Sequence, residues 1–167
     1  MAIEIERRFL VRRSSEAIGA AMGRSSYITQ GYFGCIDRLR VRVRILSNLD
    51  GDYEAFLTFK GVRRGYCRLE YEYPLTLERA RRALETLPST HIIRKRRHRV
   101  QHHDGLNWVV DQFEGQNSGL VIAETELSYS SQKIELPSWI GEEITFDRRY
   151  GNSRLSHSPM PQLAVAA

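Results

Sequence analysis

The chain has 167 residues, 41% of them hydrophobic, so it can bury the core of one domain and its composition excludes wholesale disorder. A formal net charge of +5 favours anionic partners. Of the 25 Lys and Arg residues, 22 are arginine, which binds phosphate well. Codon bias in a GC-rich genome is the simpler cause of that excess. No apolar run reaches transmembrane length, the two cysteines form no metal-type cluster and charge begins at Glu4, so we expect a cytoplasmic protein without a leader.

Alternating apolar and polar residues dominate the chain and are typical of strands that are buried on one face. The strands predicted from this alternation lie near residues 3–11, 27–34, 37–46, 53–60, 66–74, 92–102, 107–114 and 120–128. Turn signals such as Asp50-Gly51 and Asn117-Ser118-Gly119 separate neighbouring strands by short connections, which favours antiparallel pairing.

Helical spacing is rarer. We expect a short helix at 15–22 and a better one at 76–87, which Thr76 caps and Pro88 ends. A third short helix, interrupted by Pro137, is expected near 131–140. From about Ser156 the sequence has no pattern, so we expect one domain over 1–155 and a disordered tail over 156–167.

Eight strands with few helices predict a mainly β protein of the α+β class. Such strands can close into an antiparallel barrel, which removes the exposed edges of the sheet. The periodicity alone also allows an open sheet or a sandwich.

On several strands the polar face carries charged residues at alternate positions. The first strand has paired carboxylates and the third has a row of arginines, whereas a surface selected only for solubility mixes the two signs. In chain order, the charged positions are Glu4, Glu6 and Arg8; Arg38, Arg40, Arg42 and Arg44; Lys60; Arg68, Glu70 and Glu72; Lys95, Arg97 and Arg99; Asp111; and Glu124 and Glu126.

Any one of these faces is most simply explained by solvent exposure, because antiparallel sheets commonly have one wet face. Like charges at alternate strand positions repel one another, however, and the repulsion grows in a shielded interior. Carboxylate pairs would be neutralised by a hard divalent cation such as Mg²⁺ or Mn²⁺, and basic rows by phosphate oxygens. Both sets, pointing into one barrel, would form a site for a metal-bound polyphosphate.

The N-terminal stretch E-I-E-R-R, from Glu4 to Arg8, is close to a Glu-x-Glu-x-Lys motif. Further along the chain come the stretches YITQGYF, RLRVRVR, AFLTFKG, RLEYEYPL, KRRHRV, WVVDQFEG, GLVIAETEL and ELPSWIGEEITFDRRYGNSRLS. In this order they resemble the CYTH family, the triphosphate tunnel metalloenzymes, from Ile3 to about Leu155. The resemblance implies a closed eight-stranded antiparallel barrel whose lumen binds a triphosphate and Mg²⁺ or Mn²⁺.

The resemblance also implies roles for individual residues. Glu70 and Glu72 would position substrate, metal or water. Metal coordination is implied for Glu4, Glu6, Asp111, Glu124 and Glu126. Substrate binding is implied for Arg40, Arg42, Lys60, Arg68, Arg97 and Arg149, and catalytic roles for Arg8, Tyr32 and Lys95.

Two positions depart from the family pattern. Arg8 stands where the family has lysine; it keeps the positive charge but is bulkier and cannot become a neutral base. Val109 stands where many relatives have a second strand-seven carboxylate, so a second metal site would have one ligand fewer.

The first functional hypothesis is metal-dependent hydrolysis of a small-molecule triphosphate, above all inorganic tripolyphosphate. Formation of cyclic AMP from ATP, hydrolysis of thiamine or nucleoside triphosphates, and non-catalytic binding of polyphosphate or nucleotide remain alternatives. A nucleic-acid-binding module is disfavoured, because the alternation places most arginines inside the barrel. No membrane partner is expected, and a homodimer is left open.

Overall fold

The computed structural model describes residues 2–21, 25–36, 38–48, 50–102 and 105–160. Within these residues nine strands form one antiparallel sheet. Their bounds are β1 (Ala2–Val11), β2 (Ser25–Ile36), β3 (Leu39–Asn48), β4 (Tyr53–Lys60), β5 (Cys67–Pro74), β6 (Ile93–Gln101), β7 (Asn107–Phe113), β8 (Val121–Glu126) and β9 (Ile140–Glu143).

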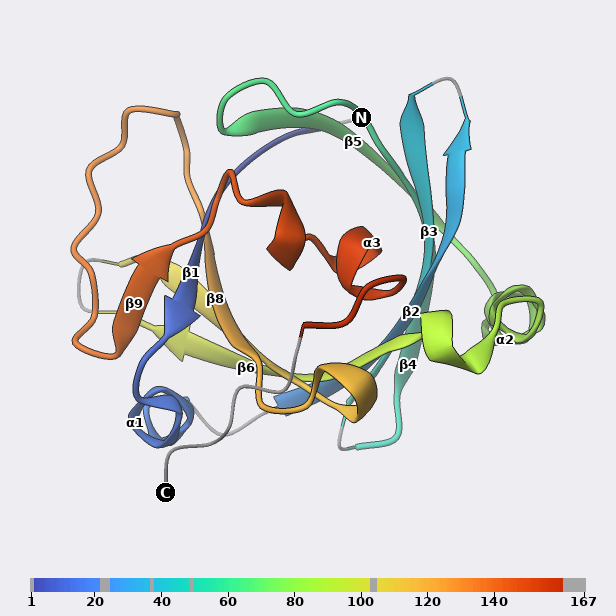
Figure 1. The fold of residues 1–167 in the computed structure, drawn as a ribbon, viewed down its shortest axis with the longest axis horizontal. Coiled ribbons are helices and arrows are strands. Elements are labelled where there is room, and N and C mark those ends of the chain that lie inside the picture. Colours follow the sequence, from blue (N-terminus) through green and yellow to red (C-terminus); the bar gives the residue numbers. More distant parts are fainter. Residues whose placement is uncertain (1, 22–24, 37, 49, 103–104, 161–167) are drawn as a thin grey trace.

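The sheet closes on itself. Its strand order is β5-β4-β3-β2-β6-β7-β8-β1-β9, and β5 pairs again with β1, where Ala2 lies opposite Glu70. Figure 1 looks into the resulting barrel. All eight predicted strands and the closed barrel are confirmed; β9 is an additional short strand on the other side of β1. Arg38 is not part of β3, because it lies in the preceding turn with a φ of 66°.

The helices lie around and over the barrel (Figure 1). Thr76 caps α2 as predicted by accepting a hydrogen bond from the Arg79 backbone N–H, and α2 packs on the outer side of β3 and β4. The helical elements are α1 (Ser14–Gly19), α2 (Leu77–Glu85) and α3 (Asn152–Leu155), with the 3-10 turns η1 (Ser89–His91), η2 (Gly115–Asn117) and η3 (Arg148–Tyr150). No described helix is long and apolar enough to cross a bilayer.

The helix predicted near 131–140 is wrong. Residues 131–139 contain no helix, and Ile140 begins β9 by pairing with Val11. Pro137 has no backbone N–H to donate within a helix and disfavours helical geometry in the residue before it. The burial of Trp139, whose ring packs edge-on to Trp108 at 5.8 Å, instead anchors this segment to the outside of the barrel.

Most of the apolar packing lies between the outer faces of the strands and the elements that cover them. Phe9, Trp108 and Trp139 form one such cluster beside α1, and Val43 with Leu84 forms another beneath α2. The strand residues that alternate with these side chains consequently face the lumen, which is why the inside of this barrel is polar.

One end of the barrel interior is filled by a third apolar cluster. Ile93, Phe113 and Ile122 lie two residues from Lys95, Asp111 and Glu124 on the same strand faces, and Leu155 of α3 packs fully buried among them. Figure 1 shows α3 lying across the barrel opening. The C-terminal segment therefore closes this end of the lumen.

The prediction of a disordered tail falls partly on described residues. Ser156 is buried, and the Met160 backbone N–H donates to Asn117 Oδ1 at 3.2 Å, so 156–160 continue the packing of the C-terminal segment. The remainder of the predicted tail, 161–167, lies outside the described residues.

Candidate active site in the barrel lumen

The barrel encloses a cavity of about 1100 Å³. Its walls come from the charged strand faces described above, together with Gly151, Asn152 and Ser153 of the C-terminal segment. The predicted site residues that line it are Glu4, Glu6, Arg8, Tyr32, Arg40, Arg42, Lys60, Arg68, Glu70, Glu72, Lys95, Arg97, Glu124 and Glu126. The alternation of the strands thus brings together side chains from seven strands, several of which are far apart in the sequence.

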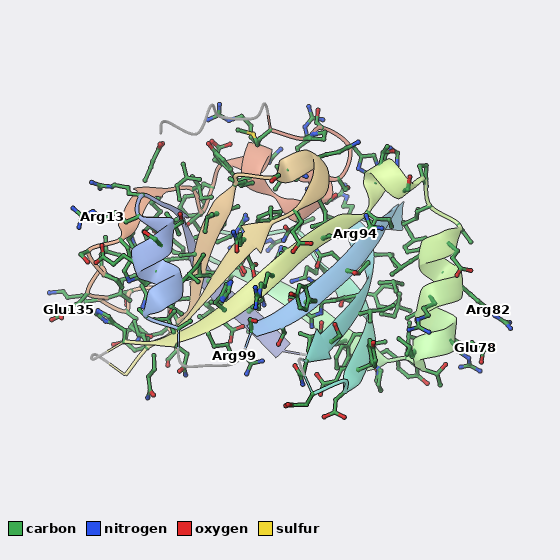
Figure 2. The ribbon with its side chains drawn as sticks, turned by 90° about the horizontal axis from the view of Figure 1, so that it is seen from below. Arg13, Glu78, Arg82, Arg94, Arg99 and Glu135 are labelled. Carbon is green, nitrogen blue, oxygen red and sulfur yellow. The ribbon has the colours of Figure 1, made fainter. Side chains whose placement is uncertain are left out.

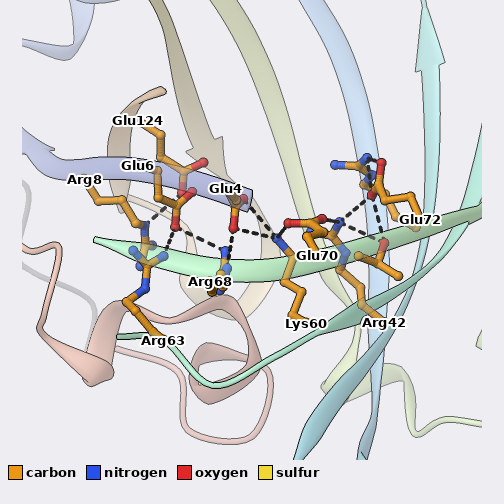
Figure 3. Close-up of polar contacts among 12 residues, drawn as sticks. Glu4, Glu6, Arg8, Arg42, Lys60, Arg63, Arg68, Glu70, Glu72 and Glu124 are labelled. Carbon is orange, nitrogen blue, oxygen red and sulfur yellow. Dashed lines mark hydrogen bonds and ion pairs between the residues drawn. The ribbon is translucent and has the colours of Figure 1, made fainter. Parts of the chain in front are cut away.

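A group of carboxylates occupies one wall of the lumen. Glu4 and Glu6 of β1 lie beside Glu124 of β8 (Figure 3). Burial raises the pKa of Glu6, and the negative charges of Glu124 and Glu4 raise it further. The positive charges of Arg68 and Arg8 only partly offset these effects, so a further cation at Glu6 would be favoured.

Glu4 differs from Glu6 because its cationic neighbours outweigh the effect of burial. Lys60 Nζ lies 3.2 Å from Glu4 Oε1, and Arg68 Nε donates to Glu4 Oε2. Burial would raise the pKa of Glu4, but Lys60 and Arg68 outweigh it and lower the pKa to about 2. Glu4 is consequently ionised at any physiological pH.

The opposite part of the lumen is basic. Arg42 Nη2 donates to Thr58 Oγ1 and to Glu72 Oε1, both at 3.0 Å, and Arg44 Nη2 donates to the same Glu72 oxygen at 3.0 Å. The Nε atoms of both arginines are buried and have no hydrogen-bond partner among the described residues. Burial lowers the pKa of Arg44, and the positive charge of Arg42 lowers it further. Two buried N–H donors in a region of excess positive charge are suited to an anion.

Lys60 connects the acidic and basic regions. Its Nζ lies 2.5 Å from Glu70 Oε2 as well as 3.2 Å from Glu4 (Figure 3). Burial lowers the pKa of Lys60, as do the positive charges of Arg42 and Arg68, although the two carboxylates oppose this. A phosphate chain that spans the two regions would pass this ammonium group.

A third ionic group lies at the closed end of the lumen. Asp111 is fully buried; its Oδ2 lies 2.5 Å from Lys95 Nζ, and Arg97 donates to both of its oxygens at 2.7 Å. Burial would raise the pKa of Asp111, but Arg97 and Lys95 outweigh it and lower the pKa. Burial lowers the pKa of Lys95 to about 8, against the opposing effect of Asp111. Asp111, implied as a metal ligand by the resemblance, thus serves here as the counter-ion of two cations.

Arg8 joins the acidic wall to the C-terminal segment. Its Nε donates to Glu124 Oε1 at 2.9 Å, and its Nη2 donates to the Tyr150 carbonyl oxygen at 2.7 Å. The single ammonium group of a lysine would have to serve both acceptors from one point, whereas the guanidinium group reaches them with separate nitrogens. The arginine at this position therefore gives the segment that closes the barrel a direct contact with the site.

Tyr32 lies in the lumen wall of β2. Its hydroxyl oxygen accepts a hydrogen bond from Gln30 Nε2 at 3.0 Å. Burial raises the pKa of Tyr32, so the hydroxyl stays protonated and can donate to an anion in the cavity.

Arg149 is the implied site residue that the structure places away from the cavity. It lies on η3, where its guanidinium pairs with Asp147 at 2.6 Å and remains 72% exposed. The two residues are close in sequence, so this local ion pair keeps the side chain on the surface.

Three contributors to the site were not assigned a role from the sequence. Arg44 continues the alternation of Arg40 and Arg42, so the row itself was a sufficient signal. Gln30 lies two residues before Tyr32 on the same strand face. Arg63 reaches Glu6 from the turn between β4 and β5, which no strand periodicity could reveal. Arg94 lies on the outer face of β6, and Glu78 and Arg82 project outward from α2 (Figure 2). Arg99, at the rim, is among the residues that line the cavity.

The acidic wall has the donor chemistry that a hard divalent cation requires, because Glu4, Glu6 and Glu124 offer carboxylate oxygens. Burial raises the pKa of Glu6, and the charges of the other two carboxylates add to that effect. Among the described residues no three His, Cys, Asp or Glu side chains converge as ligands of one ion. The carboxylate oxygens are instead bonded to basic side chains, which are Arg8, Lys60, Arg63, Arg68 and Arg97. The residues fit a divalent cation chemically, and its binding would exchange some of these contacts.

Comparison with known proteins gives consistent results. The model of the family described as CYTH domain matches residues 2–159. An inorganic triphosphatase of Acetivibrio thermocellus is 39% identical over 159 residues, which cover 95% of this chain and 96% of the relative. An inorganic triphosphatase of Nitrosomonas europaea is 32% identical over 161 residues, covering 93% and 97%. The crystal structure of the inorganic triphosphatase NE1496 superposes with a TM-score of 0.62 at 29% identity, over 96% of this chain and 98% of that one.

Proposed function

Because this chain belongs to the CYTH family, we propose that it is a metal-dependent triphosphatase that hydrolyses inorganic tripolyphosphate inside the barrel. The observation that carries the proposal is the pair of buried Nε atoms of Arg42 and Arg44, which have no hydrogen-bond partner among the described residues and are suited to an anionic ligand. The inorganic triphosphatases that resemble this chain over nearly its whole length support the choice of substrate. We place the enzyme in the cytoplasm on the grounds of its sequence.

The phosphate chain would lie along the basic part of the lumen. Arg42 and Arg44 would each donate their Nε–H to a phosphate oxygen, and Lys60 would contact the part of the chain nearest the acidic wall. Arg40, which is exposed at the lumen edge, would hold the outer end. Arginine is well suited to this task because its planar group can bind two phosphate oxygens at once.

A divalent cation, Mg²⁺ or Mn²⁺, would be held by Glu4, Glu6 and Glu124, the carboxylates of the acidic wall. Triphosphatases of this family depend on a metal, and a bound cation would screen the charge of the terminal phosphate and polarise a water molecule. Glu126 of β8 lies opposite Glu6 and would contribute from the open side.

Hydrolysis would break the bond between the terminal phosphorus and its bridging oxygen while water forms a new bond to that phosphorus, so that tripolyphosphate and water give pyrophosphate and phosphate. Negative charge develops on the bridging oxygen as it leaves. Arg8 and Lys60, which already contact the acidic wall, and Tyr32, a protonated hydroxyl, would stabilise this charge.

Phosphate release from tripolyphosphate, measured with Mg²⁺ and with Mn²⁺, tests the proposal against ATP and thiamine triphosphate as competing substrates. Arg42→Gln removes a charged donor to the substrate, so kcat/KM should fall about 10- to 100-fold. Arg40→Gln, at the exposed edge of the lumen, should lower kcat/KM by a smaller factor. Arg81→Gln, on the outer helix α2, should leave kcat/KM unchanged. Thermal melting would verify that each variant is folded.

The proposal fails if tripolyphosphate is bound without release of phosphate, which would indicate a non-catalytic binder. Conversion of ATP to a cyclic nucleotide at a higher kcat/KM than any hydrolysis would favour the cyclase instead.

A further inference from the structure

We propose that Arg63 competes with the divalent cation for the carboxylate of Glu6 and so sets the metal affinity of the lumen. The inference rests on the metal-dependent function proposed above. It adds a residue from a turn to a site otherwise built from strands and from the C-terminal segment.

The turn between β4 and β5 directs Arg63 back toward the barrel. Gly65 has a φ of 58°, and Arg64 pairs with Cys67 through backbone hydrogen bonds of 2.8 and 3.1 Å, which fold the turn tightly. Arg63 Nη1 donates to the Tyr66 carbonyl oxygen at 3.1 Å, and its Nη2 donates to Glu6 Oε1. Figure 3 shows the guanidinium group rising from the turn to the acidic wall.

Two guanidinium groups share this oxygen, but they are not equally free to leave it. Arg68 Nη2 lies 3.2 Å from Glu6 Oε1 while its Nε is bonded to Glu4, so Arg68 belongs to both carboxylates. Arg63 has no second carboxylate among the described residues, and its other hydrogen bond goes to a carbonyl of its own turn. Arg63 is therefore the cation that can be exchanged at the lowest cost.

A metal ion bound to Glu6 would use the same oxygen lone pairs that accept the Arg63 hydrogen bond, so the two contacts exclude each other at that oxygen. Any free energy of the Arg63–Glu6 contact must be given up when the metal binds, and the apparent metal affinity falls by the corresponding factor. The Arg63 side chain is 21% exposed and Glu6 only 9%, so solvent weakens the contact without abolishing it.

Arg64 provides a matched control. It carries the same charge in the same turn, but it is exposed and no side-chain hydrogen bond is recorded for it among the described residues. Removing either arginine changes the net charge equally, and salt screens that general effect. A difference between the two variants would therefore measure the specific contact with Glu6.

The test is calorimetric titration of the full-length protein with Mn²⁺ in the absence of any phosphate substrate. We expect Arg63→Ala to bind Mn²⁺ about fivefold more tightly than the unmodified protein, and Arg64→Ala to stay within about twofold of it. Arg63→Gln, which preserves the packing of the side-chain stem, should shift the affinity in the same direction. In a Glu6→Gln background, where binding is weak, Arg63→Ala should give no gain.

Equal affinities of Arg63→Ala and Arg64→Ala, or weaker binding by Arg63→Ala than by the unmodified protein, would overturn the inference while leaving the proposed function intact. Unchanged Mn²⁺ binding by Glu6→Gln alone would remove Glu6 from the metal site, which would overturn both this inference and the metal assignment of the proposed function.

Discussion

Asp111 is expected to be a determinant of stability because it neutralises two cations at the closed end of the lumen. In Asp111→Asn the amide keeps the shape of the side chain but removes its charge. Lys95 is 2% exposed and would lose its only ion pair among the described residues, while Arg97 would keep Glu124 at 3.2 Å. Removing one partner of a buried ion pair costs about 3–5 kcal/mol.

Neutralisation of Lys95 limits this penalty. Lys95 has a pKa of about 8 even beside Asp111, so without that carboxylate it would become neutral near pH 7 instead of remaining an unpaired buried charge. We therefore expect the lower end of the range, about 3 kcal/mol. For a chain of this length we expect the melting temperature to fall by roughly 10 °C.

Urea unfolding followed by circular dichroism measures this penalty directly. Glu126→Gln is the matched control, because it removes a lumen carboxylate for which no ion pair is recorded among the described residues; its free energy of unfolding should change by less than about 1 kcal/mol. If Asp111→Asn also stayed within about 1 kcal/mol of the unmodified protein, Asp111 would not be the counter-ion described above.

Three further predictions concern the residues that hold the site together. Arg8→Lys keeps the charge beside Glu124 but loses the second hydrogen bond, to Tyr150. The free energy of unfolding, measured by urea titration, should fall by roughly 1–3 kcal/mol while tripolyphosphate is still hydrolysed. An unchanged free energy of unfolding would contradict a stabilising role for the contact with Tyr150. The pKa of Asp111 lies below its ordinary value of 3.8. The stability that its ionised carboxylate contributes is therefore complete above pH 3.8 and is lost as the pH falls through the lower folded-state pKa. Melting curves measured against pH should show this acid-induced loss in the unmodified protein and lack it in Asp111→Asn. Leu155→Ala should cost about 2–5 kcal/mol, because it leaves a cavity in the apolar cluster that closes the barrel, and a loss below about 1 kcal/mol would indicate that α3 is not anchored there.

The strand alternation was the most informative property of the sequence. It is a local property with a period of two, so it placed Glu4 and Glu6, Arg42 and Glu124 correctly on faces that meet inside the barrel. Closure of the ring was implied by the family resemblance alone, since the pairing of β1 with β5 joins residues at opposite ends of the first half of the chain.

The pairing of individual charges could not be predicted in the same way. Alternation shows that Asp111 faces inward, but only the three-dimensional register places Lys95 and Arg97 against it. Substrate binding was implied for Arg149 by the family resemblance, yet the nearby Asp147 retains it on the surface. Arg63 lies in a turn, where no periodicity indicates the direction of a side chain.

The central claim is that this lumen hydrolyses a triphosphate with a metal held by the carboxylates of β1 and β8. Phosphorus NMR of tripolyphosphate incubated with the protein and Mg²⁺ tests it most directly, with Glu4→Gln as the inactive variant and Glu142→Gln, an exposed residue of β9, as its matched control. The account predicts that the tripolyphosphate signals give way to equal amounts of pyrophosphate and phosphate with the unmodified protein and Glu142→Gln, and persist with Glu4→Gln. Persistent tripolyphosphate in every sample, or equal rates for the two variants, would contradict it.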